Sequence, residues 1–326
     1  YFMSKLSELV RGNLLSILAD NKFHSGEALG KTLGISRAAI SNHIKVFSSL
    51  GLDIFSVTGK GYCLAQPLTL LDLDKISDHL VSSFSADIEV LNVIGSTNQY
   101  LKDKSDVLKN GHTCLAEAQT AGRGRHGRKW VSPYAASLYL SMHWSFAGGY
   151  SVLGGLSLAV GVAIVEALNQ CGVQGIQLKW PNDIYAQGKK LAGVLIEVEG
   201  QIGSGCQAIV GVGLNVTLPK NVEEIGQPWI DLAQLSDPLI NRNLLAGTLV
   251  SELTKSLSLF ENSGLEPFIS KWRGLDVYAN QAVKLIIGQQ AISGISRGID
   301  ANGAILLETK QGIKAYHGGE VSVRPI

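Results

Sequence analysis

The sequence has few cysteines and no close spacing among them. The four cysteines are far apart in the chain: Cys63, Cys114, Cys171 and Cys206. Neither a zinc site nor the disulfide framework of a small secreted domain is therefore indicated. No secretory signal is visible, and Tyr1 and Phe2 before Met3 are interpreted as an added tail. These absences predict a protein of the reducing cytoplasm.

The chain also lacks a large net charge and a membrane-spanning run. Its formal net charge is +1, with 17% charged and 45% hydrophobic residues, which favours a soluble protein of two or three packed domains among 326 residues. Residues 1–65 are more basic, with seven Lys and Arg against four Asp and Glu. The uncharged run 146–165 contains five glycines and continues into an amphipathic segment, so a buried helix is favoured over a membrane span.

The first 65 residues predict a winged helix-turn-helix. Apolar residues recur at helical spacing over residues 6–18, and Ser25 and Ser36 are placed to cap two further short helices. Residues 52–65 predict a hairpin with Lys60 at its tip. The expected DNA contacts are the outward residues of the third helix and this tip: Arg37, Ala38, Ser41, Asn42, Lys45 and Lys60. A small helical domain that binds protein is the alternative.

The rest of the chain predicts a largely antiparallel sheet with helices on one face, followed by a small SH3-like barrel, an α+β protein in all. Strands are expected at residues 87–94, 113–119, 137–144, 177–185, 190–199 and 207–216. Helices are expected from residue 96 to 102, at 152–171 and at 239–262, with an irregular and mobile segment at 219–229. Four short strands between residues 282 and 317, with a hairpin turn at Asn302-Gly303, predict the barrel. The expected domains are 3–66, 67–274 and 275–326, with a hinge at Pro67 and the leucines that follow.

The most distinctive segment is Gly122-Arg-Gly-Arg-His-Gly-Arg-Lys-Trp130. Four fixed cations fall within seven residues, and the glycines between them allow positive φ and close approach of a ligand to the backbone. Arginine presents a planar fork of donors that suits carboxylate and phosphate. The pattern predicts a mobile loop that closes over an anion.

Other interpretations of this loop are a dinucleotide fingerprint, an RNA-binding Arg-Gly segment and a solvated surface turn. The fingerprint requires a helix directly after it and an acidic residue about 20 positions on. Here Ser132-Pro133 follow at once, and no acidic residue occurs between Glu117 and Glu166. Arg-Gly segments for RNA are long and disordered, unlike this one. The surface turn remains open.

Three further motifs place polar residues at strand ends. Lys179-Trp-Pro-Asn-Asp183 is a charged, amide-rich cluster at a proline, and Val210-Gly-Val-Gly-Leu-Asn215 is a glycine-lined strand. Lys189 and Lys190 open an apolar strand, and because side chains alternate along a strand only one of the two can face a site. Taken singly, each motif is more typical of structure than of function.

Taken in order, the four motifs resemble those of the biotin–protein ligases, specifically the bifunctional form that is also the biotin operon repressor, and the resemblance covers essentially the whole chain. It implies a class II synthetase-like ligase domain. It also implies that biotin's carboxylate attacks the α-phosphate of ATP to give biotinyl-5′-adenylate, with Mg²⁺ shielding the phosphates. A lysine of biotin carboxyl carrier protein then attacks this mixed anhydride.

The resemblance assigns residues by matching motif. Those for biotin are Ser96, Thr97, Asn98, Gln119, Arg123, Gly124, Arg125, Lys190 and Gly193. Those for ATP are Arg128, Lys129, Asp183, Asn215, Trp229 and Arg324. Lys190, Arg125 and Asp183 are the expected catalytic residues, with Asp183 also the expected Mg²⁺ ligand. His126 stands where known members have a further arginine, so we do not expect this position to be essential.

The repressor half implied by the resemblance is an adenylate-bound homodimer that presents two recognition helices to a two-fold operator. Two alternatives remain at this stage. A lipoate–protein ligase would share the architecture but lacks the winged helix. A ligand-sensing repressor without ligase activity would not need to retain Lys190 and the arginine loop.

Overall fold

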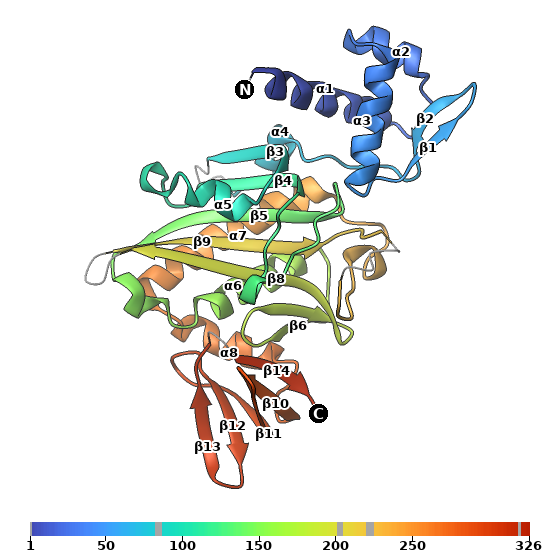
Figure 1. Cartoon of the computed structure of the whole chain (residues 1–326). Coiled ribbons are helices and arrows are strands. Elements are labelled where there is room, and N and C mark those ends of the chain that lie inside the picture. Colours follow the sequence, from blue (N-terminus) through green and yellow to red (C-terminus); the bar gives the residue numbers. More distant parts are fainter. Residues whose placement is uncertain (1, 82–86, 201–204, 220–224, 319–320) are drawn as a thin grey trace.

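The computed structural model describes residues 2–81, 87–200, 205–219, 225–318 and 321–326. It consists of a small helical unit at the amino end, a large central sheet with helices, and a second sheet at the carboxyl end (Figure 1). The three units follow one another along the chain, so the two termini lie at opposite ends of the molecule (Figure 1).

The amino-terminal unit is the expected winged helix-turn-helix. Its elements are α1 (Phe2–Leu18), α2 (Gly26–Leu33), α3 (Arg37–Ser49), β1 (Ile54–Val57) and β2 (Gly61–Leu64). Ser25 and Ser36 cap α2 and α3 by accepting backbone N–H bonds, as expected. Ile40, Ile44 and Phe47 point into the core. The opposite side of α3 and the turn of the hairpin are therefore left to solvent, where Arg37, Ala38, Asn42, Lys45 and Lys60 are exposed and Ser41 is half-buried.

The central sheet has seven strands and is antiparallel except for one parallel pair, β3 with β4. Its spatial order is β3 (Ile88–Ile94), β4 (Thr113–Gln119), β5 (Ser137–Phe146), β9 (Cys206–Asn215), β8 (Lys189–Gly200), β7 (Asp183–Ala186) and β6 (Ile176–Lys179). The expected single strand at 177–185 is wrong, because the chain reverses at Pro181 and forms the β6–β7 hairpin instead. Proline has no N–H to give to a ladder, which explains the break.

The long helices cover one face of this sheet, and one short helix lies on the other (Figure 1). Against the first face pack α4 (Leu73–Ser77), α6 (Leu156–Gln170), α7 (Arg242–Ser263) and α8 (Glu266–Leu275), of which α4 and α8 were not expected. The start of α6 is later than expected because Gly155 has a positive φ, and residues 149–153 form a 3-10 turn. On the opposite face, α5 (Thr97–Lys102) touches Ser141 of β5. Within the described residues, no helix combines the length and the apolar character that crossing a membrane requires.

The carboxyl-terminal unit is a five-stranded antiparallel sheet, consistent with the expected small barrel. Its spatial order is β13 (Gly312–Tyr316), β12 (Ile305–Thr309), β11 (Gln290–Ile299), β10 (Ala282–Ile287) and β14 (Val321–Pro325). The expected turn at Asn302-Gly303 lies between β11 and β12, and Gly303 has the positive φ that such turns require. The unexpected strand β14 carries Arg324 toward the central sheet.

The winged helix contacts the central unit at Tyr134, which lies in the segment that follows the arginine loop. Tyr134 donates its backbone N–H to Leu50 O at 2.9 Å, and its ring meets Phe47 edge-on with centroids 6.1 Å apart. Its hydroxyl donates to Asn92 Oδ1 on β3 at 2.9 Å. A single buried side chain thus joins the end of the recognition helix to the central sheet.

The chain between the first two units, where a hinge was expected, is held by hydrogen bonds to the central unit. Leu71 N donates to Glu117 Oε1 at 2.5 Å, and Arg242 Nη1 donates to Thr69 O at 2.8 Å. Arg242 and Glu117 themselves form an ion pair at 2.8 Å, with side chains only 4% and 3% exposed. Asn243 adds bonds to the backbone of residues 70 and 72. Both members of the buried ion pair therefore bond to the linker backbone, and these bonds fix its path.

We expect Arg242→Ala to lower the free energy of unfolding by about 3–5 kcal/mol, because it leaves the buried Glu117 carboxylate without its counter-ion. Lys271→Ala is the matched control, since its pair with Glu166 is exposed and should contribute less than about 1 kcal/mol. Urea unfolding followed by circular dichroism measures both. Equal losses in the two variants would contradict a structural role for the buried pair.

Candidate active site

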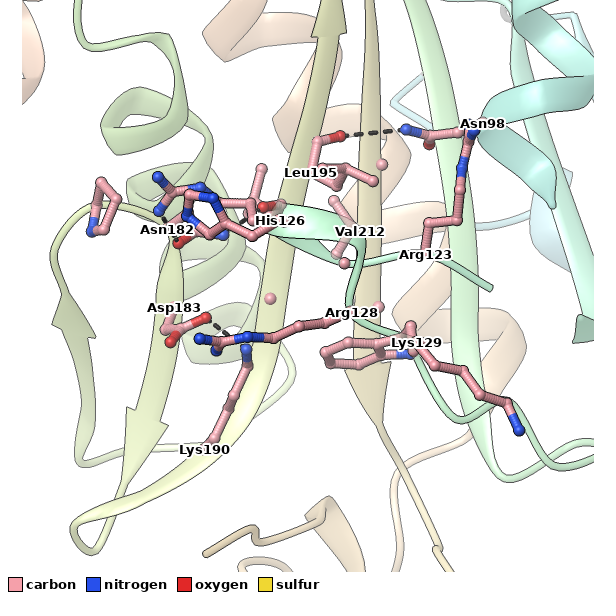
Figure 2. A pocket seen from close by; sticks show the side chains of 18 of the residues that line it. Asn98, Arg123, His126, Arg128, Lys129, Asn182, Asp183, Lys190, Leu195 and Val212 are labelled. Carbon is pink, nitrogen blue, oxygen red and sulfur yellow. Dashed lines mark hydrogen bonds and ion pairs between the residues drawn. The ribbon is translucent and has the colours of Figure 1, made fainter. Parts of the chain in front are cut away.

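A single cavity on the sheet face opposite the long helices collects most of the residues singled out in the sequence (Figure 2). Its walls come from the start of α5, the arginine loop, the β7–β8 hairpin and the end of β14. Its floor is formed by β8 and β9. The cavity has a polar end at α5, where Arg123 lies beside Asn98 and its charge is balanced by Glu197, and a charged end at Lys190 and Asp183 (Figure 2).

The floor is made of glycines because other groups lie directly on it. A Cβ atom at Gly211 would overlap Asn98 Oδ1, and one at Gly213 would overlap the indole of Trp130. The Gly-Val-Gly sequence of β9 therefore lets α5 and the end of the arginine loop pack onto the sheet.

The polar end is a network of amides and hydroxyls. Gln119 Oε1 accepts from Thr97 N at 2.9 Å and from Thr97 Oγ1 at 3.2 Å, while its Nε2 donates to Ser132 Oγ at 3.1 Å. Ser141 Oγ lies 2.6 Å from Asn98 Oδ1. Ser96 caps α5 at the rim. Such an array suits an uncharged ligand group that both donates and accepts hydrogen bonds.

The charged end is built on an ion pair between Lys190 Nζ and Asp183 Oδ1 at 2.5 Å. Lys190 is half-buried and lines the cavity, whereas Lys189 is exposed and does not, as the alternation of a strand predicts. Lys179 Nζ lies 3.1 Å from the Tyr185 hydroxyl and 3.8 Å from Asp183 Oδ2. Arg128 and Lys129 also line the cavity, together with Arg324. So many cations around one carboxylate favour binding of an anion.

The pKa of Lys179 is lowered to about 8, mainly because burial disfavours its charged form. The nearby cations Arg324, Lys190 and Arg128 lower this pKa further, and the Asp183 carboxylate opposes them. Burial likewise lowers the pKa of Arg125, the cation at the mouth of the cavity.

The arginine loop is folded over the sheet, with Arg123, His126, Gly127, Arg128 and Lys129 still exposed to solvent on its outer side. Its base is closed by Trp130 N donating to Gly122 O at 2.9 Å and by Gly124 N donating to Arg128 O at 2.7 Å. At the tip, His126 has a φ of 57° within a 3-10 turn and lines the cavity. Arg125 Nη1 donates to Asn182 Oδ1 at 3.1 Å and thereby bridges the loop to the β6–β7 hairpin.

Thirteen of the fifteen residues expected to bind the two small molecules line this cavity. They are Ser96, Thr97, Asn98, Gln119, Arg123, Gly124, Arg125, Arg128, Lys129, Asp183, Lys190, Gly193 and Arg324. The DNA candidates lie apart from them, on the winged helix.

Asn215 and Trp229 are not among the residues that line the cavity, and their assignment to the nucleotide stays a prediction. Asn215 is 5% exposed and donates Nδ2 to Ile230 O at 3.0 Å, which holds the neighbouring segment against β9. Trp229 pairs with Lys190 through the backbone. The irregular segment expected at 219–229 is described only in part, because residues 220–224 lie outside the described residues.

Several residues of the site had no role assigned from the sequence. Trp130 lies beneath the loop, with its ring centroid 5.3 Å from Lys190 Nζ. Asn182 accepts a hydrogen bond from Arg125 through its Oδ1. Both belong to recognised motifs. Glu197 lies on the same side of β8 as Gly193, which strand alternation could have revealed. No sequence motif pointed to Ser141, because its hydroxyl meets Asn98 only when α5 packs on the sheet.

A metal cage made by the protein alone is not found in the part of the chain that the structure describes. No group of three or more His, Cys, Asp or Glu side chains there is arranged to hold a metal ion. Asp183 is the one carboxylate among the described residues that line the cavity. A single carboxylate fits a Mg²⁺ ion whose other ligands are phosphates and water.

Three family models match successive parts of the chain. The first is described as HTH domain and matches residues 11–63. The second, Biotin/lipoate A/B protein ligase family, matches residues 90–215, and the third, Biotin protein ligase C terminal domain, matches residues 278–324.

Curated relatives match over nearly the full length. The chain is 49% identical to the bifunctional ligase/repressor BirA of Salmonella typhimurium, over 95% of this chain and 96% of that protein. The same protein of Escherichia coli K12 is 48% identical with the same coverage. Among solved structures, the biotin protein ligase of Aquifex aeolicus in complex with biotin and ATP is 30% identical with a TM-score of 0.65, covering 74% of this chain and all of that one.

We expect Asp183→Asn to lower the pKa of Lys179 below its value of about 8, because the carboxylate stabilises the charged amine. The ¹⁵Nζ chemical shift of the lysine followed against pH measures this, with Lys179→Arg assigning the resonance. Glu199→Gln is the control, since this carboxylate pairs with Lys102. A midpoint that stays in place or rises in Asp183→Asn would contradict the charge balance described for this end of the cavity.

Proposed function

Because the chain belongs to the biotin protein ligases, in the branch of bifunctional ligase/repressors, we propose that this cavity is where it activates biotin with ATP and from which it passes biotin to a carrier-protein lysine. The observation that carries the proposal is the joining of a polar hydrogen-bonding end and a cationic end in one cavity beneath the arginine loop. Biotin has the same two parts, a ureido ring and a carboxylate.

The polar end receives the ureido ring. Its donors and acceptors are supplied by Ser96, Thr97, Asn98 and Gln119, and Gly211 lets the start of α5 lie close enough to the floor to present them. The aliphatic chain of biotin then runs along the β8–β9 floor past Gly193, which brings the carboxylate to Lys190.

The first step takes place at the charged end. A carboxylate oxygen of biotin attacks the α-phosphorus of ATP, the bond to the bridging oxygen breaks, and pyrophosphate leaves. Two anions must meet, so fixed cations that need no reorganisation lower the barrier. Lys190 neutralises the carboxylate and the α-phosphoryl oxygens, while Arg128, Lys129 and Arg324 hold the outer phosphates.

Mg²⁺ would be held by Asp183 and the nucleotide phosphates, and it shields phosphate charge when bound. The Lys190–Asp183 pair holds both side chains in the cavity, where Lys190 can pair with the incoming carboxylate and Asp183 would be the residue that holds Mg²⁺.

The second step is attack by the acceptor lysine. Its neutral amine adds to the acyl carbon of biotinyl-5′-adenylate, AMP leaves, and the nitrogen loses a proton. Until then the anhydride must be protected from water. The arginine loop does this from above, held across the cavity mouth by Arg125 and Asn182.

The amino-terminal unit gives the protein its repressor function. We place the operator contacts on the exposed side of α3 and at the hairpin tip, at Arg37, Ala38, Ser41, Asn42, Lys45 and Lys60. The adenylate-bound form acts as a homodimer, because a two-fold operator needs two recognition helices and the adenylate favours the form that pairs. The proposed domains are residues 3–66, 67–274 and 275–326.

Two other functions fit less well. A lipoate ligase would have no use for the winged helix. A repressor that only senses ligand would not need a lysine and a carboxylate paired inside the cavity.

We expect Lys190→Ala to slow biotinyl-adenylate formation at least about a hundredfold, since it removes the cation nearest the reacting groups. Pyrophosphate release with biotin and ATP measures the rate. Lys189→Ala, the exposed neighbour on the same strand, is the matched control and should keep the wild-type rate. A normal rate in Lys190→Ala would refute this assignment, whereas no biotin-dependent release by the wild-type protein would refute the ligase activity itself.

We expect Arg37→Ala to weaken operator binding by about ten- to a hundredfold while ligation continues at the normal rate, because Arg37 lies on the exposed side of α3. Fluorescence anisotropy with operator DNA at several salt concentrations measures binding. Lys75→Ala, an exposed change on α4, is the control. A parallel loss of ligase activity would argue against separate DNA-binding and ligase units.

A further inference from the structure

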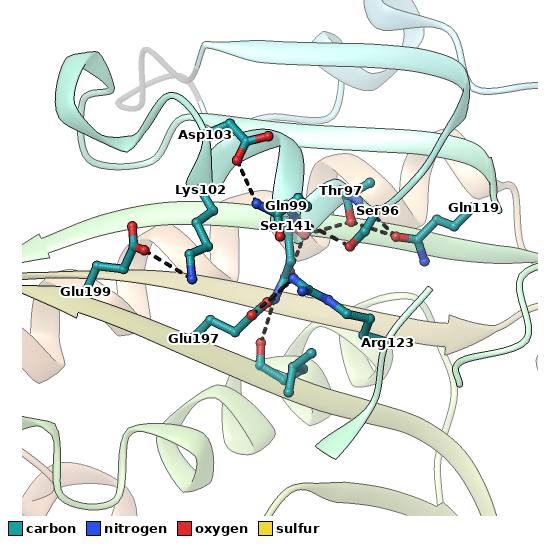
Figure 3. A network of polar contacts seen from close by, with 12 residues as sticks. Ser96, Thr97, Gln99, Lys102, Asp103, Gln119, Arg123, Ser141, Glu197 and Glu199 are labelled. Carbon is teal, nitrogen blue, oxygen red and sulfur yellow. Dashed lines mark hydrogen bonds and ion pairs between the residues drawn. The ribbon is translucent and has the colours of Figure 1, made fainter. Parts of the chain in front are cut away.

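A carboxylate just outside the cavity lining joins two of its walls. Glu197 lies on β8, on the same side as Gly193 and Leu195, and its side chain is 23% exposed. It accepts two hydrogen bonds from Arg123 Nη2, at 3.0 and 2.8 Å. It also accepts one from Asn98 Nδ2 at 2.9 Å. The arginine loop and the start of α5 therefore meet on one side chain (Figure 3).

This contact changes the role of Arg123. The sequence suggested that Arg123 reaches over biotin, but its guanidinium is engaged by Glu197 on the sheet. The contacts of Arg123 with β8 and of Arg125 with Asn182 thus both hold the loop. Of these, the Arg123 contact joins two opposite charges, and bonds of that kind are stronger than those to neutral groups.

Glu197 and the Leu195 carbonyl together set the orientation of the Asn98 amide, because Asn98 Nδ2 also donates to Leu195 O at 3.3 Å. An ionised carboxylate can only accept, so it requires the NH₂ group of Asn98 to point toward β8. The Asn98 oxygen then lies toward Ser141, 2.6 Å from its hydroxyl. A glutamine at 197 could either donate or accept, and it would leave the Leu195 carbonyl alone to hold this direction.

We propose that Glu197 is a positioning residue that latches the arginine loop closed through Arg123 and orients Asn98, and so retains the biotinyl-adenylate between the two steps. The inference rests on the proposed ligand site. Its consequence is kinetic: loss of the latch lets the loop open and the anhydride escape before an acceptor lysine arrives.

Glu199 offers a matched control two residues further along the same side of β8. It pairs with Lys102 at 3.1 Å, a contact between α5 and β8 that does not involve the loop (Figure 3). Glu197→Gln and Glu199→Gln therefore make the same chemical change on the same strand, with and without a link to the arginine loop.

The test measures release of labelled biotinyl-adenylate from the preformed complex of the full chain. Glu197→Gln should release it about two- to tenfold faster than wild type, because the Arg123 side chain is 40% exposed and solvent screens its contact with Glu197. Glu199→Gln should match wild type, and Glu197→Asp should restore part of the retention. The double variant Arg123→Gln/Glu197→Gln should release the adenylate more slowly than two independent effects predict, because both changes break one contact.

Release from Glu197→Gln at the wild-type rate would overturn the inference, as would full additivity in the double variant. If the wild-type chain formed no adenylate, the proposed function would fail and the latch with it. If the wild-type chain formed the adenylate normally and Glu197→Gln released it at the unchanged rate, only the proposed role of Glu197 would be rejected.

Discussion

Seven cationic side chains line one cavity whose described lining contains a single carboxylate. They are Arg123, Arg125, Arg128, Lys129, Lys179, Lys190 and Arg324. Such a concentration of like charge is unfavourable in the ligand-free protein, and ion pairs to some of the cations reduce the repulsion. Lys190 pairs with Asp183, and Arg123 pairs with Glu197 behind the wall. The cavity keeps an excess of positive charge. This excess favours binding of a ligand that carries a carboxylate and a triphosphate.

The second constraint is steric, and it comes from the glycines of the cavity floor, which have no side chains. The glycines of β8 and β9 let Asn98 and Trp130 lie directly on the sheet. The polar end of the cavity and the base of the arginine loop are thereby held at fixed depth against a rigid floor. Without this close approach, the hydrogen bonds of Thr97 and Gln119 would not face the same space as Lys190.

The DNA-binding unit and the ligand cavity are joined by a short length of chain. The arginine loop ends at Trp130, and four residues later Tyr134 packs against Phe47 of the recognition helix. On the other side, the linker is fixed by the buried Arg242–Glu117 pair. Glu117 lies on the strand that ends at Gln119, so the same strand supports both the linker and the cavity. The two functions of the protein thus share one structural frame.

The sequence by itself determined the local elements and most of the residues of the site. Ser25, Ser36 and Ser96 cap helices as their types predict, and strand alternation distinguished Lys190 from Lys189, because these preferences act within a few residues. The tertiary structure alone decided that Asn215 holds a neighbouring segment, that Arg123 turns to Glu197, and that the linker is clamped. Each of these outcomes depends on charges and amides brought together from distant parts of the chain, and such pairing follows from sheet order and helix packing, which no local pattern encodes.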